Sequence, residues 1–312
     1  MRSPSQKEHD MLEPMELTGK TFIITGANSG IGFAAARQMA KAGATVVMAS
    51  RSLERGTAAL NEIVHSTGSQ TVHLLQVDMA SMSSIRGFVK SFLARFDRLD
   101  GLVNNAANFD ISKTTPSFTD SGAECIFATN HLGPFLLTNL LLDTLKASAP
   151  SRVVNISSKG LLLYPFLKIQ FDDLTTSRKR KYSPSYAYYH SKLAHIMFTR
   201  ELARRLEGSG VTANVIRVPN VRIDVSRYPD VHPVLLKMYD LKQRSAITPD
   251  QMAATYLKVA ADPDLASANG VHFDEHARPV GMPSFAKDDQ ACARLWDISV
   301  QMTGIDKPEK LL

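Results

Sequence analysis

A tyrosine and a lysine past the middle of the chain have the spacing of a proton-transfer pair. Tyr188 and Lys192 lie one helical turn apart in a segment with helical periodicity, so both side chains project from one face of the expected helix. Lowering the pKa of a phenol from about 10 to about 7 takes roughly 4 kcal/mol. An ammonium group about 4 Å away supplies about 4 kcal/mol at an effective dielectric constant near 20. The pair can therefore give a proton to an oxygen that gains negative charge.

Two other polar residues stand where they could join this pair. Ser158 follows an expected strand at Arg152–Ile156 and therefore lies at the carboxyl edge of the sheet, where open α/β sheets bind ligands. Asn130 lies on a long helix expected around residues 123–146. For Tyr188 alone, packing of the ring on an amphipathic helix is the alternative, because several other tyrosines are nearby.

A glycine-rich turn, Gly26-Ala27-Asn28-Ser29-Gly30-Ile31-Gly32, follows the first expected strand, Thr21–Thr25. Glycines allow close approach of the backbone to a pyrophosphate, and the N-terminus of the next helix offers N–H groups and a positive dipole end. The spacing Gly-x-x-x-Gly-x-Gly differs from the general Gly-x-Gly-x-x-Gly fingerprint. Glycines also serve turns for purely conformational reasons. The position after the first strand favours dinucleotide binding.

The end of the second expected strand, Thr45–Ala49, indicates which dinucleotide is bound. An NAD enzyme is expected to place an acidic residue near this point to hold the ribose hydroxyls. Here the chain reads Ser50-Arg51, and the guanidinium of Arg51 can bind a 2′-phosphate in bidentate fashion, with help from Ser29. A surface arginine at a strand end is the alternative. The sequence therefore predicts NADP as the cofactor.

Short apolar runs alternate with helical patterns over the first two hundred residues, which predicts right-handed βαβ units. The fold class is therefore α/β: a single doubly wound Rossmann domain with a mostly parallel sheet of about seven strands and helices on both faces. The domain spans residues 15–312, after a flexible N-terminal tail at 1–14, and carries a substrate lid at about 221–246. Besides the three strands already given, strands are expected at Val72–Val77, Gly101–Asn104, Thr212–Val218 and near Val271–Phe273. Helices are expected at Ile31–Lys41, Leu53–His65, Ser83–Phe96, around 123–146, at Tyr186–Glu207, after Thr248 and near Phe285–Met302.

Several motifs in this order resemble the short-chain dehydrogenase/reductase family from about residue 17 to about residue 304. They are the glycine turn, Asn104-Asn105-Ala106-Ala107, Thr129–Gly133 with Asn130, Asn155–Ser158, and Tyr188-x-x-x-Lys192. The stretches FATNHLGPFLLTNLLLDTLKASAP and YHSKLAHIMFTRELARRL look like the retinol-dehydrogenase-like branch, which includes the WW domain-containing oxidoreductase.

The resemblance implies a catalytic set of Asn130, Ser158, Tyr188 and Lys192. In it, Ser158 hydrogen-bonds the substrate oxygen, Asn130 holds a water that links Lys192 to solvent, and Asp78 is the acid at the adenine. A helix cap is the alternative role for Asp78. The second serine of the pair carries the role in this family, which favours Ser158 over Ser157. The residues expected to hold the cofactor are Gly26, Asn28, Ser29, Gly30, Ile31, Gly32, Arg51, Asp78, Met79, Asn105, Ala106, Tyr188, Lys192, Pro219 and Val221.

Two segments depart from the family pattern. Members usually have Pro-Gly and then a threonine after the sixth strand, whereas this chain reads Val218-Pro219-Asn220-Val221-Arg222-Ile223. Asn220 is expected to tolerate the left-handed turn that glycine would make. The interval between Ser158 and Tyr188 is longer than expected and holds an apolar run at Leu161–Phe166. We expect this run to face Val234–Tyr239 across the nicotinamide, as wall and lid, with ordinary lid packing as the alternative.

Composition limits the class of protein. The net charge is +6, but the positive residues are scattered apart from the run Arg178–Lys181, so no nucleic-acid partner is expected. No run of about 20 apolar residues predicts a membrane span. The two cysteines, Cys125 and Cys292, are far apart, which fits a reducing cytoplasm. No metal site is expected, because His272 and His276 lack a zinc-ligand pattern.

The function expected is NADP(H)-dependent hydride transfer between the nicotinamide and the carbonyl or alcohol carbon of a hydrophobic small molecule, with Tyr188 as the acid/base. Two alternatives remain: a non-redox enzyme on the same fold, such as an epimerase or dehydratase, and a cofactor-binding regulator without turnover. The resemblance also implies a homodimer or homotetramer assembled through the helices around 123–146 and 186–207.

Overall fold

The computed structural model describes residues 15–109, 115–174, 181–222 and 246–305. The predicted tail (residues 1–14), the segment 223–245 of the predicted lid and most of the basic run Arg178–Lys181 lie outside the described residues. Val234–Tyr239, expected to face the apolar run after Ser158, lies outside them as well.

One parallel sheet of seven strands runs through the domain in the order β3-β2-β1-β4-β5-β6-β7. The strands are β1 (Thr21–Thr25), β2 (Thr45–Ser50), β3 (Val72–Gln76), β4 (Gly101–Asn104), β5 (Ser151–Ser158), β6 (Val211–Val218) and β7 (His272–Phe273). The chain moves outward from β1 to β3 and then returns to place β4 on the other side of β1. The carboxyl ends of β1 and β4 therefore flank the switch point, where such sheets bind ligands. The predicted fold class is confirmed.

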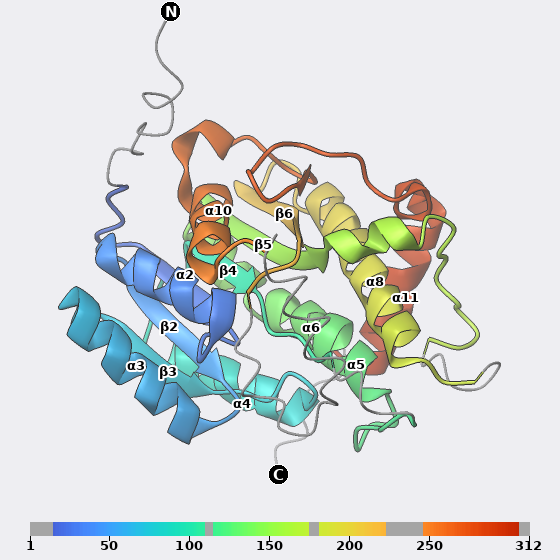
Figure 1. Cartoon of the computed structure of the whole chain (residues 1–312), viewed down its shortest axis with the longest axis horizontal. Helices are drawn as coiled ribbons and strands as arrows, with labels where there is room; N and C mark the ends of the chain where they lie inside the picture. The colour runs from blue at the N-terminus through green and yellow to red at the C-terminus, as the bar shows by residue number, and fades with distance from the viewer. Residues whose placement is uncertain (1–14, 110–114, 175–180, 223–245, 306–312) are drawn as a thin grey trace, which may run out of the picture.

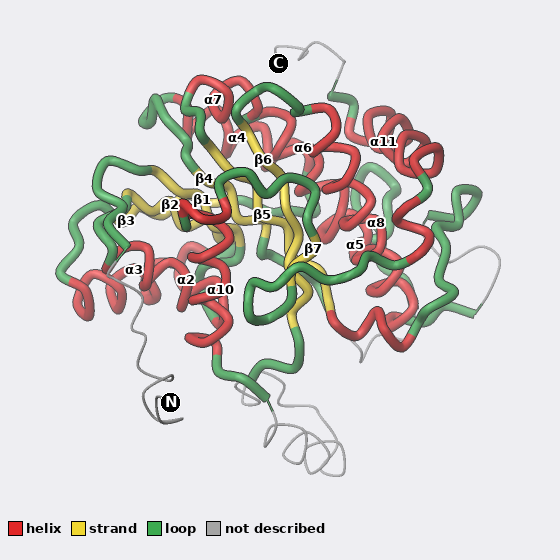
Figure 2. Tube along the Cα trace, turned by 90° about the horizontal axis from the view of Figure 1, so that it is seen from above, coloured by secondary structure: helices red, strands yellow, loops and turns green. Residues whose placement is uncertain are grey.

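Helices cover both faces of the sheet, as the turned view in Figure 2 shows. Successive residues of a strand enter opposite cores: Phe22 and Ile24 of β1 pack on one side, and Ile23 packs on the other. This burial on both faces explains the apolar strands. The first face carries α2 (Gly30–Lys41), α3 (Leu53–Thr67) and α10 (Pro249–Ala261). The second carries α4 (Met82–Leu93), α6 (Gly133–Leu140), α7 (Leu142–Ala147), α8 (Pro184–Arg205) and α11 (Asp289–Thr303) (Figure 1).

The single long helix expected around residues 123–146 is wrong, because this segment is interrupted. It consists of the short α5 (Cys125–Phe127), a π-helical turn at Ala128–Leu132, α6 and α7. Pro134 follows the π turn, and a proline ring clashes with the carbonyl four residues earlier, which belongs to Asn130. Widening the helix to a π turn accommodates the proline, and such turns are frequent at functional sites.

The C-terminal helix α11 packs on α6 and α8. The Trp296 ring lies 4.9 Å from Phe135 and 5.9 Å from Phe198, and His131 Nε2 lies 2.8 Å from Ser299 Oγ. Part of the helical surface that we assigned to subunit assembly is thus covered by the same chain. Assembly through these helices stays a prediction.

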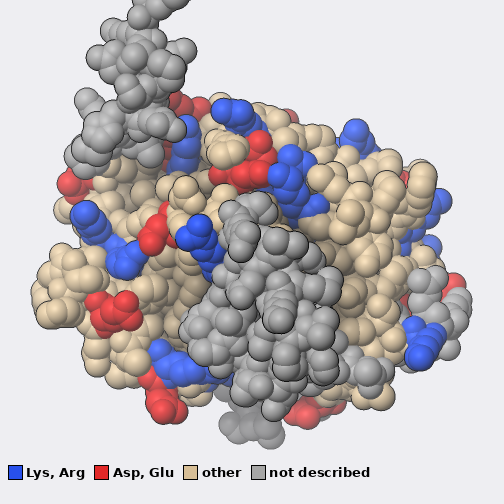
Figure 3. All heavy atoms as spheres, in the orientation of Figure 1, with Lys and Arg blue, Asp and Glu red and all other residues tan. Residues whose placement is uncertain are grey.

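The surface carries charges of both signs. On the face drawn in Figure 3, Lys and Arg side chains are interspersed with Asp and Glu, as their scatter along the sequence predicts.

Among the helices that the structure describes, none combines the length and the apolar character needed to cross a bilayer. Both cysteines are free thiols; Cys125 is half-buried and Cys292 is buried.

Candidate active site

The glycine turn lies at the switch point, between the end of β1 and the first turn of α2. Gly26 and Gly30 have φ angles of +69° and +58°, in the left-handed region that favours glycine. Gly32 is needed for close packing instead: a Cβ there would lie 2.5 Å from both the Gly26 carbonyl oxygen and Asn105 Nδ2. The turn is therefore compact and leaves backbone as its outer surface.

The residues after β4 lock onto this turn. Asn105 donates from Nδ2 to the Thr25 carbonyl at 2.9 Å. The Thr25 hydroxyl accepts the backbone N–H groups of Asn105 at 3.0 Å and Ala106 at 2.9 Å. The predicted cofactor residues Asn105 and Ala106 are thus brought together with the glycine turn.

The start of α2 offers hydrogen-bond donors to an anion. Ser29 is the N-cap with an extended backbone, yet its side chain makes no capping hydrogen bond, and the first turn holds no acidic residue. The half-buried Asn28 and Ile31 flank this end of the helix. Backbone N–H groups, a positive dipole end and the space left by Gly32 together fit a pyrophosphate.

Arg51 stands exposed at the carboxyl end of β2. Its backbone is fixed, because its carbonyl accepts from Gln76 Nε2 at 3.0 Å and the next residue, Ser52, caps α3. A rigid backbone with an exposed guanidinium suits a phosphate contact, and the role in cofactor choice stays a prediction.

Asp78 follows β3, and its side chain turns the backbone locally. Its Oδ1 accepts from Ala80 N at 2.9 Å, and its own N–H donates to Ser84 Oγ at 2.9 Å. The N-cap of α4 is Ser81, so the helix-cap alternative for Asp78 is wrong. Met79 is buried, and Gly133 of α6 packs against its carbonyl oxygen. Adenine contacts of this segment stay a prediction.

Ser158 and Tyr188 bring two hydroxyl groups together at the carboxyl edge of the sheet. Ser158 ends β5, accepts from Gly160 N at 3.2 Å and hydrogen-bonds with the Tyr188 hydroxyl. The preceding Ser157 points the other way, since its Oγ donates to the Lys192 carbonyl at 3.2 Å. The geometry agrees with the choice of Ser158 over Ser157.

The electrostatics of Tyr188 differ from the expectation. Burial of its hydroxyl raises the pKa of Tyr188 above its ordinary value, the Tyr189 phenol raises it further, and the hydrogen bond with Ser158 lowers it. Lys192 does not point at the phenol: its Nζ donates to the Ile156 carbonyl at 2.8 Å and lies 5.6 Å from the centre of the Tyr188 ring.

Burial also changes the pKa of Lys192, which is only 2% exposed. The loss of solvation lowers the pKa of Lys192 to about 7, so the ammonium is held at the edge of deprotonation. The spacing of Tyr188 and Lys192 reflects only the attraction between ammonium and phenolate. It does not include the cost of removing both groups from water, and in the protein alone that cost dominates.

Asn130 lies in the π turn and is buried. Its Oδ1 accepts from Asn108 N at 2.6 Å, and its Nδ2 donates to the Asn108 carbonyl at 3.1 Å and to Ser191 Oγ at 3.0 Å. Ser191 in turn donates to the Tyr188 carbonyl at 2.7 Å. Asn130 therefore connects the loop after β4 to the helical turn that carries Tyr188. The water link to Lys192 stays a prediction.

Known proteins share both the sequence and this architecture. The short chain dehydrogenase family model matches residues 20–166. The chain is 40% identical to human retinol dehydrogenase 13 over 298 residues, covering 94% of this chain and 87% of that one. It is 39% identical to mouse retinol dehydrogenase 14 over 315 residues, covering 97% and 91%. The chain belongs to the short-chain dehydrogenase/reductase family.

A solved structure extends the likeness to three dimensions. The crystal structure of an uncharacterised protein from Mycobacterium paratuberculosis superposes with a TM-score of 0.70 at 32% identity, covering 94% of this chain and 97% of that one. Members of the short-chain dehydrogenase/reductase family are oxidoreductases that use a nicotinamide cofactor, and this chain falls in its retinol-dehydrogenase-like branch. The predicted family is therefore confirmed, and of the predicted enzyme class the oxidoreductase part is confirmed.

A buried ladder of amides, which we did not predict, ties the elements of this short-chain dehydrogenase together. Asn104 Nδ2 donates to Asn155 Oδ1 at 2.8 Å and to Thr138 Oγ1 at 3.0 Å, and Asn155 Nδ2 donates to Thr199 Oγ1 at 2.9 Å. These bonds join β4 and β5 to α6 and α8. An asparagine within each of two strands expected to be buried on both faces was the available signal, since buried amides need partners.

The altered turn after β6 has an ordinary backbone. Among the described non-glycine residues only Ala277 has a positive φ, so the left-handed conformation expected for Asn220 is wrong. The chain instead continues extended: Val221 pairs in parallel with Ile247, and Arg222 N donates to the Ile247 carbonyl at 2.9 Å. This pairing removes the need for a glycine. Pro219 and Val221 are half-buried at the edge of the site, and Ile223 lies outside the described residues.

Aromatic and aliphatic side chains dominate the other side of Ser158. The Phe109 ring lies 4.2 Å from that of Tyr188, and Tyr189 lies between Tyr188 (5.3 Å) and Tyr164 (4.7 Å). Gly160 makes room for the Tyr189 ring.

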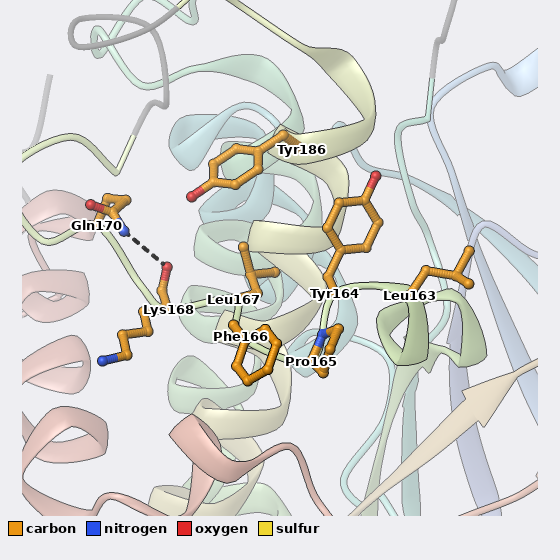
Figure 4. A pocket seen from close by; sticks show the side chains of 8 residues that line it. All are labelled: Leu163, Tyr164, Pro165, Phe166, Leu167, Lys168, Gln170 and Tyr186. Atoms are coloured by element: carbon orange, nitrogen blue, oxygen red, sulfur yellow. Dashed lines mark hydrogen bonds between the residues drawn. The ribbon is translucent and has the colours of Figure 1, made fainter.

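Beyond this set of rings lies a surface groove of about 370 Å³ (Figure 4). The exposed Leu163 and Phe166 and the ring of Tyr186 form its apolar wall, and Lys168 and Gln170 lie at one end. The apolar run that we placed beside the substrate is thus largely exposed, apart from Leu161.

His272, one of the two histidines considered as metal ligands, is held by the backbone. His272 Nδ1 contacts the Gly281 carbonyl at 3.1 Å, and its burial lowers the pKa to about 4. No group of three or more potential metal ligands occurs among the described residues.

Proposed function

We propose that this short-chain dehydrogenase transfers a hydride between NADP(H) and the carbonyl or alcohol carbon of a hydrophobic small molecule, with Tyr188 as the acid/base. One observation carries the proposal. The hydroxyls of Ser158 and Tyr188 meet at the switch-point edge of the sheet, with the buried Lys192 one helical turn away. A carbonyl oxygen placed between the two hydroxyls would be polarised by both.

The chain's residues divide the work of carbonyl reduction. Ser158 donates a hydrogen bond to the substrate oxygen, Tyr188 gives that oxygen its proton, and the Lys192 ammonium stabilises the phenolate left behind. The cofactor, when bound, supplies the hydride and, once oxidised, a positively charged ring. Because burial holds the pKa of Tyr188 high, the phenolate forms only when positive charge gathers beside it.

The glycine turn and the end of β2 support NADP(H) as this cofactor. The compact turn presents backbone to a pyrophosphate, and no acidic residue stands between Ser50 and Leu53 to repel a 2′-phosphate. A charge-assisted bond from Arg51 contributes about 1.5–3 kcal/mol, equivalent to roughly ten- to a hundredfold in affinity.

The rings around Tyr188 support a hydrophobic substrate. The rings of Phe109, Tyr189 and Tyr164 offer flat apolar surfaces near the Tyr188 ring. Two similar proteins are retinol dehydrogenases, so an apolar alcohol such as retinol, or its aldehyde, is a reasonable first substrate to test.

The free cysteines support a location in the cytoplasm.

Turnover of a carbonyl panel tests the proposal. Purified protein is mixed with NADPH and an apolar aldehyde or ketone, or with NADP and the corresponding alcohol. The absorbance of the reduced nicotinamide is then followed. We expect oxidation of NADPH with at least one apolar carbonyl compound. Cofactor binding without any turnover would favour the regulator, and a changed substrate without net NADPH consumption would favour an epimerase or dehydratase.

A further inference from the structure

Tyr256 of α10 is an unusual member of an apolar core. It is the largest fully buried side chain of the described residues, with 0% exposure, and the rest of its core is aliphatic and aromatic. A buried hydroxyl normally has a hydrogen-bond partner. The partner here is at the glycine turn: the Tyr256 hydroxyl donates to Asn105 Oδ1 at 3.2 Å.

This hydrogen bond completes the contacts of the Asn105 amide. One end of the amide donates from Nδ2 to the Thr25 carbonyl at 2.9 Å, and the other end accepts from Tyr256. A rotated amide would set its oxygen against the Thr25 carbonyl oxygen, and two acceptors repel each other. The hydroxyl and the carbonyl therefore select one orientation of Asn105.

The Asn105 amide fills the space that two glycines leave open. An added Cβ would lie 2.5 Å from Asn105 Nδ2 at Gly32 and 3.3 Å from it at Gly26. The amide thus packs against both ends of the turn, at the end of β1 and in the first turn of α2. A movement of the amide would move the backbone on either side of it.

We propose that Tyr256 is a positioning residue for the cofactor: through Asn105, it holds the glycine turn in the conformation that receives the dinucleotide. The inference rests on the proposed function, in which this turn binds NADP(H). A site ordered before binding loses less conformational freedom when the ligand arrives, so the effect falls on cofactor affinity.

The Tyr256 hydroxyl remains a donor over the working pH range. Burial raises its pKa well above the ordinary value, and the charge of Tyr188 raises it further. The bond to Asn105 is therefore not lost when the site changes protonation.

Tyr256→Phe tests the proposal, because it keeps the ring and removes only the hydroxyl. The dissociation constant for NADPH, from fluorescence titration, is expected to rise about tenfold, with kcat at saturating NADPH and the melting temperature nearly unchanged. Tyr182→Phe is the matched control, since it removes a hydroxyl that donates to Glu124 Oε1 at 3.0 Å in another part of the chain. The control should bind NADPH like the wild type.

A double-mutant cycle shows whether Tyr256 acts through Asn105. Asn105→Ala alone should weaken NADPH binding, and adding Tyr256→Phe should weaken it no further. Equal losses in both backgrounds would overturn the proposal, as would wild-type affinity in Tyr256→Phe. Those two results leave the proposed function standing. A wild-type protein that binds neither NADPH nor NADH would instead overturn the proposed function, and this inference with it.

Discussion

The two sides of the switch point are lined by different chemical groups. On the nucleotide side, backbone groups and short polar side chains interlock, as Thr25, Asn105 and Gly32 do within about one hydrogen-bond length of each other. On the substrate side, the residues after Ser158 present rings and aliphatic groups, and Leu163 and Phe166 are 79% and 91% exposed.

The nucleotide side binds the cofactor, which the reaction of every substrate requires. The substrate side determines which substrates are preferred. The nucleotide side tolerates little change at Gly26 and Gly32, because an added Cβ there would lie 3.0 Å or less from a neighbouring atom. The substrate side is shaped by side chains whose loss leaves the backbone in place. We therefore expect substitutions on the first side to change cofactor affinity and those on the second to alter substrate selectivity.

Gly32→Ala should have the largest effect. The added Cβ would overlap the Gly26 carbonyl oxygen and Asn105 Nδ2, so the turn must open. A penalty of about 2.8 kcal/mol is within the range for overpacking and corresponds to a hundredfold loss of NADPH affinity. Titration of NADPH measures it. Gly87→Ala in α4 is the control, since nothing lies within 4 Å of a Cβ there. Equal affinity in both variants would refute the tight-turn account.

The substrate side should carry more of the sensitivity to acid. His190 of α8 is fully buried, and burial lowers its pKa from 6.5 to about 4. The unfolded chain binds this proton more readily, so the stability is complete above about pH 6.5 and is lost as the pH falls toward 4. The loss reaches about 2 kcal/mol at pH 5.

Urea unfolding of His190→Gln at about pH 7.5 and about pH 5 measures this contribution. We expect the variant to lose about 2 kcal/mol less than the wild type between the two values. His65→Gln on the exposed face of α3 is the control and should behave like the wild type. An unchanged pH dependence in His190→Gln would contradict the assignment.

Arg51 should set cofactor choice. The wild type is expected to bind NADPH at least about tenfold more tightly than NADH. Arg51→Asp should reverse the order, because it removes the donor group and places an anion beside the 2′-phosphate. Parallel titrations with both cofactors decide. The control is Arg55→Asp, because Arg55 is also exposed and lies in the first turn of α3. Equal wild-type affinities would return Arg51 to a surface role.

Truncations in the groove should have the smallest effect. Leu163→Ala and Phe166→Ala are expected to shift the ratio of kcat/KM for bulky and small carbonyls by about fivefold, less than the tenfold or more that a methylene contributes in an enclosed pocket. Their melting temperatures should stay near that of the wild type. Leu161→Ala provides the contrast, because this buried residue should cost about 2–5 kcal/mol of stability. Unaltered selectivity with lowered stability would favour simple packing.

Features that depend on the local spacing of residues could be predicted from the sequence. The glycine turn, the strands and the pair Tyr188 and Lys192 depend on local spacing, and the structure places the strand ends within two residues of those predicted. The break before Pro134 was missed because the apolar pattern around residues 123–146 was followed across a proline, although a proline in a helix interior breaks or kinks the helix.

Long-range contacts were beyond such reasoning. The bond from Tyr256 to Asn105 joins residues 151 positions apart, and the Lys192 ammonium turns to the Ile156 carbonyl on another element. A one-dimensional pattern shows which face of a helix a residue occupies, but not which atom across the interface it meets. The burial that changes the pKa of Tyr188 and of Lys192 also depends on contacts between residues far apart in the sequence.

Single-turnover reduction by Tyr188→Phe tests whether Tyr188 supplies the proton to the substrate oxygen. The substitution keeps the ring beside Phe109 and removes the proton and the bond to Ser158. We expect the first turnover of a carbonyl substrate with bound NADPH to slow by at least about a hundredfold, while the NADPH dissociation constant stays within about threefold of the wild-type value. A variant that reduces the substrate at a rate close to that of the wild type would contradict the assignment of Tyr188 as the acid.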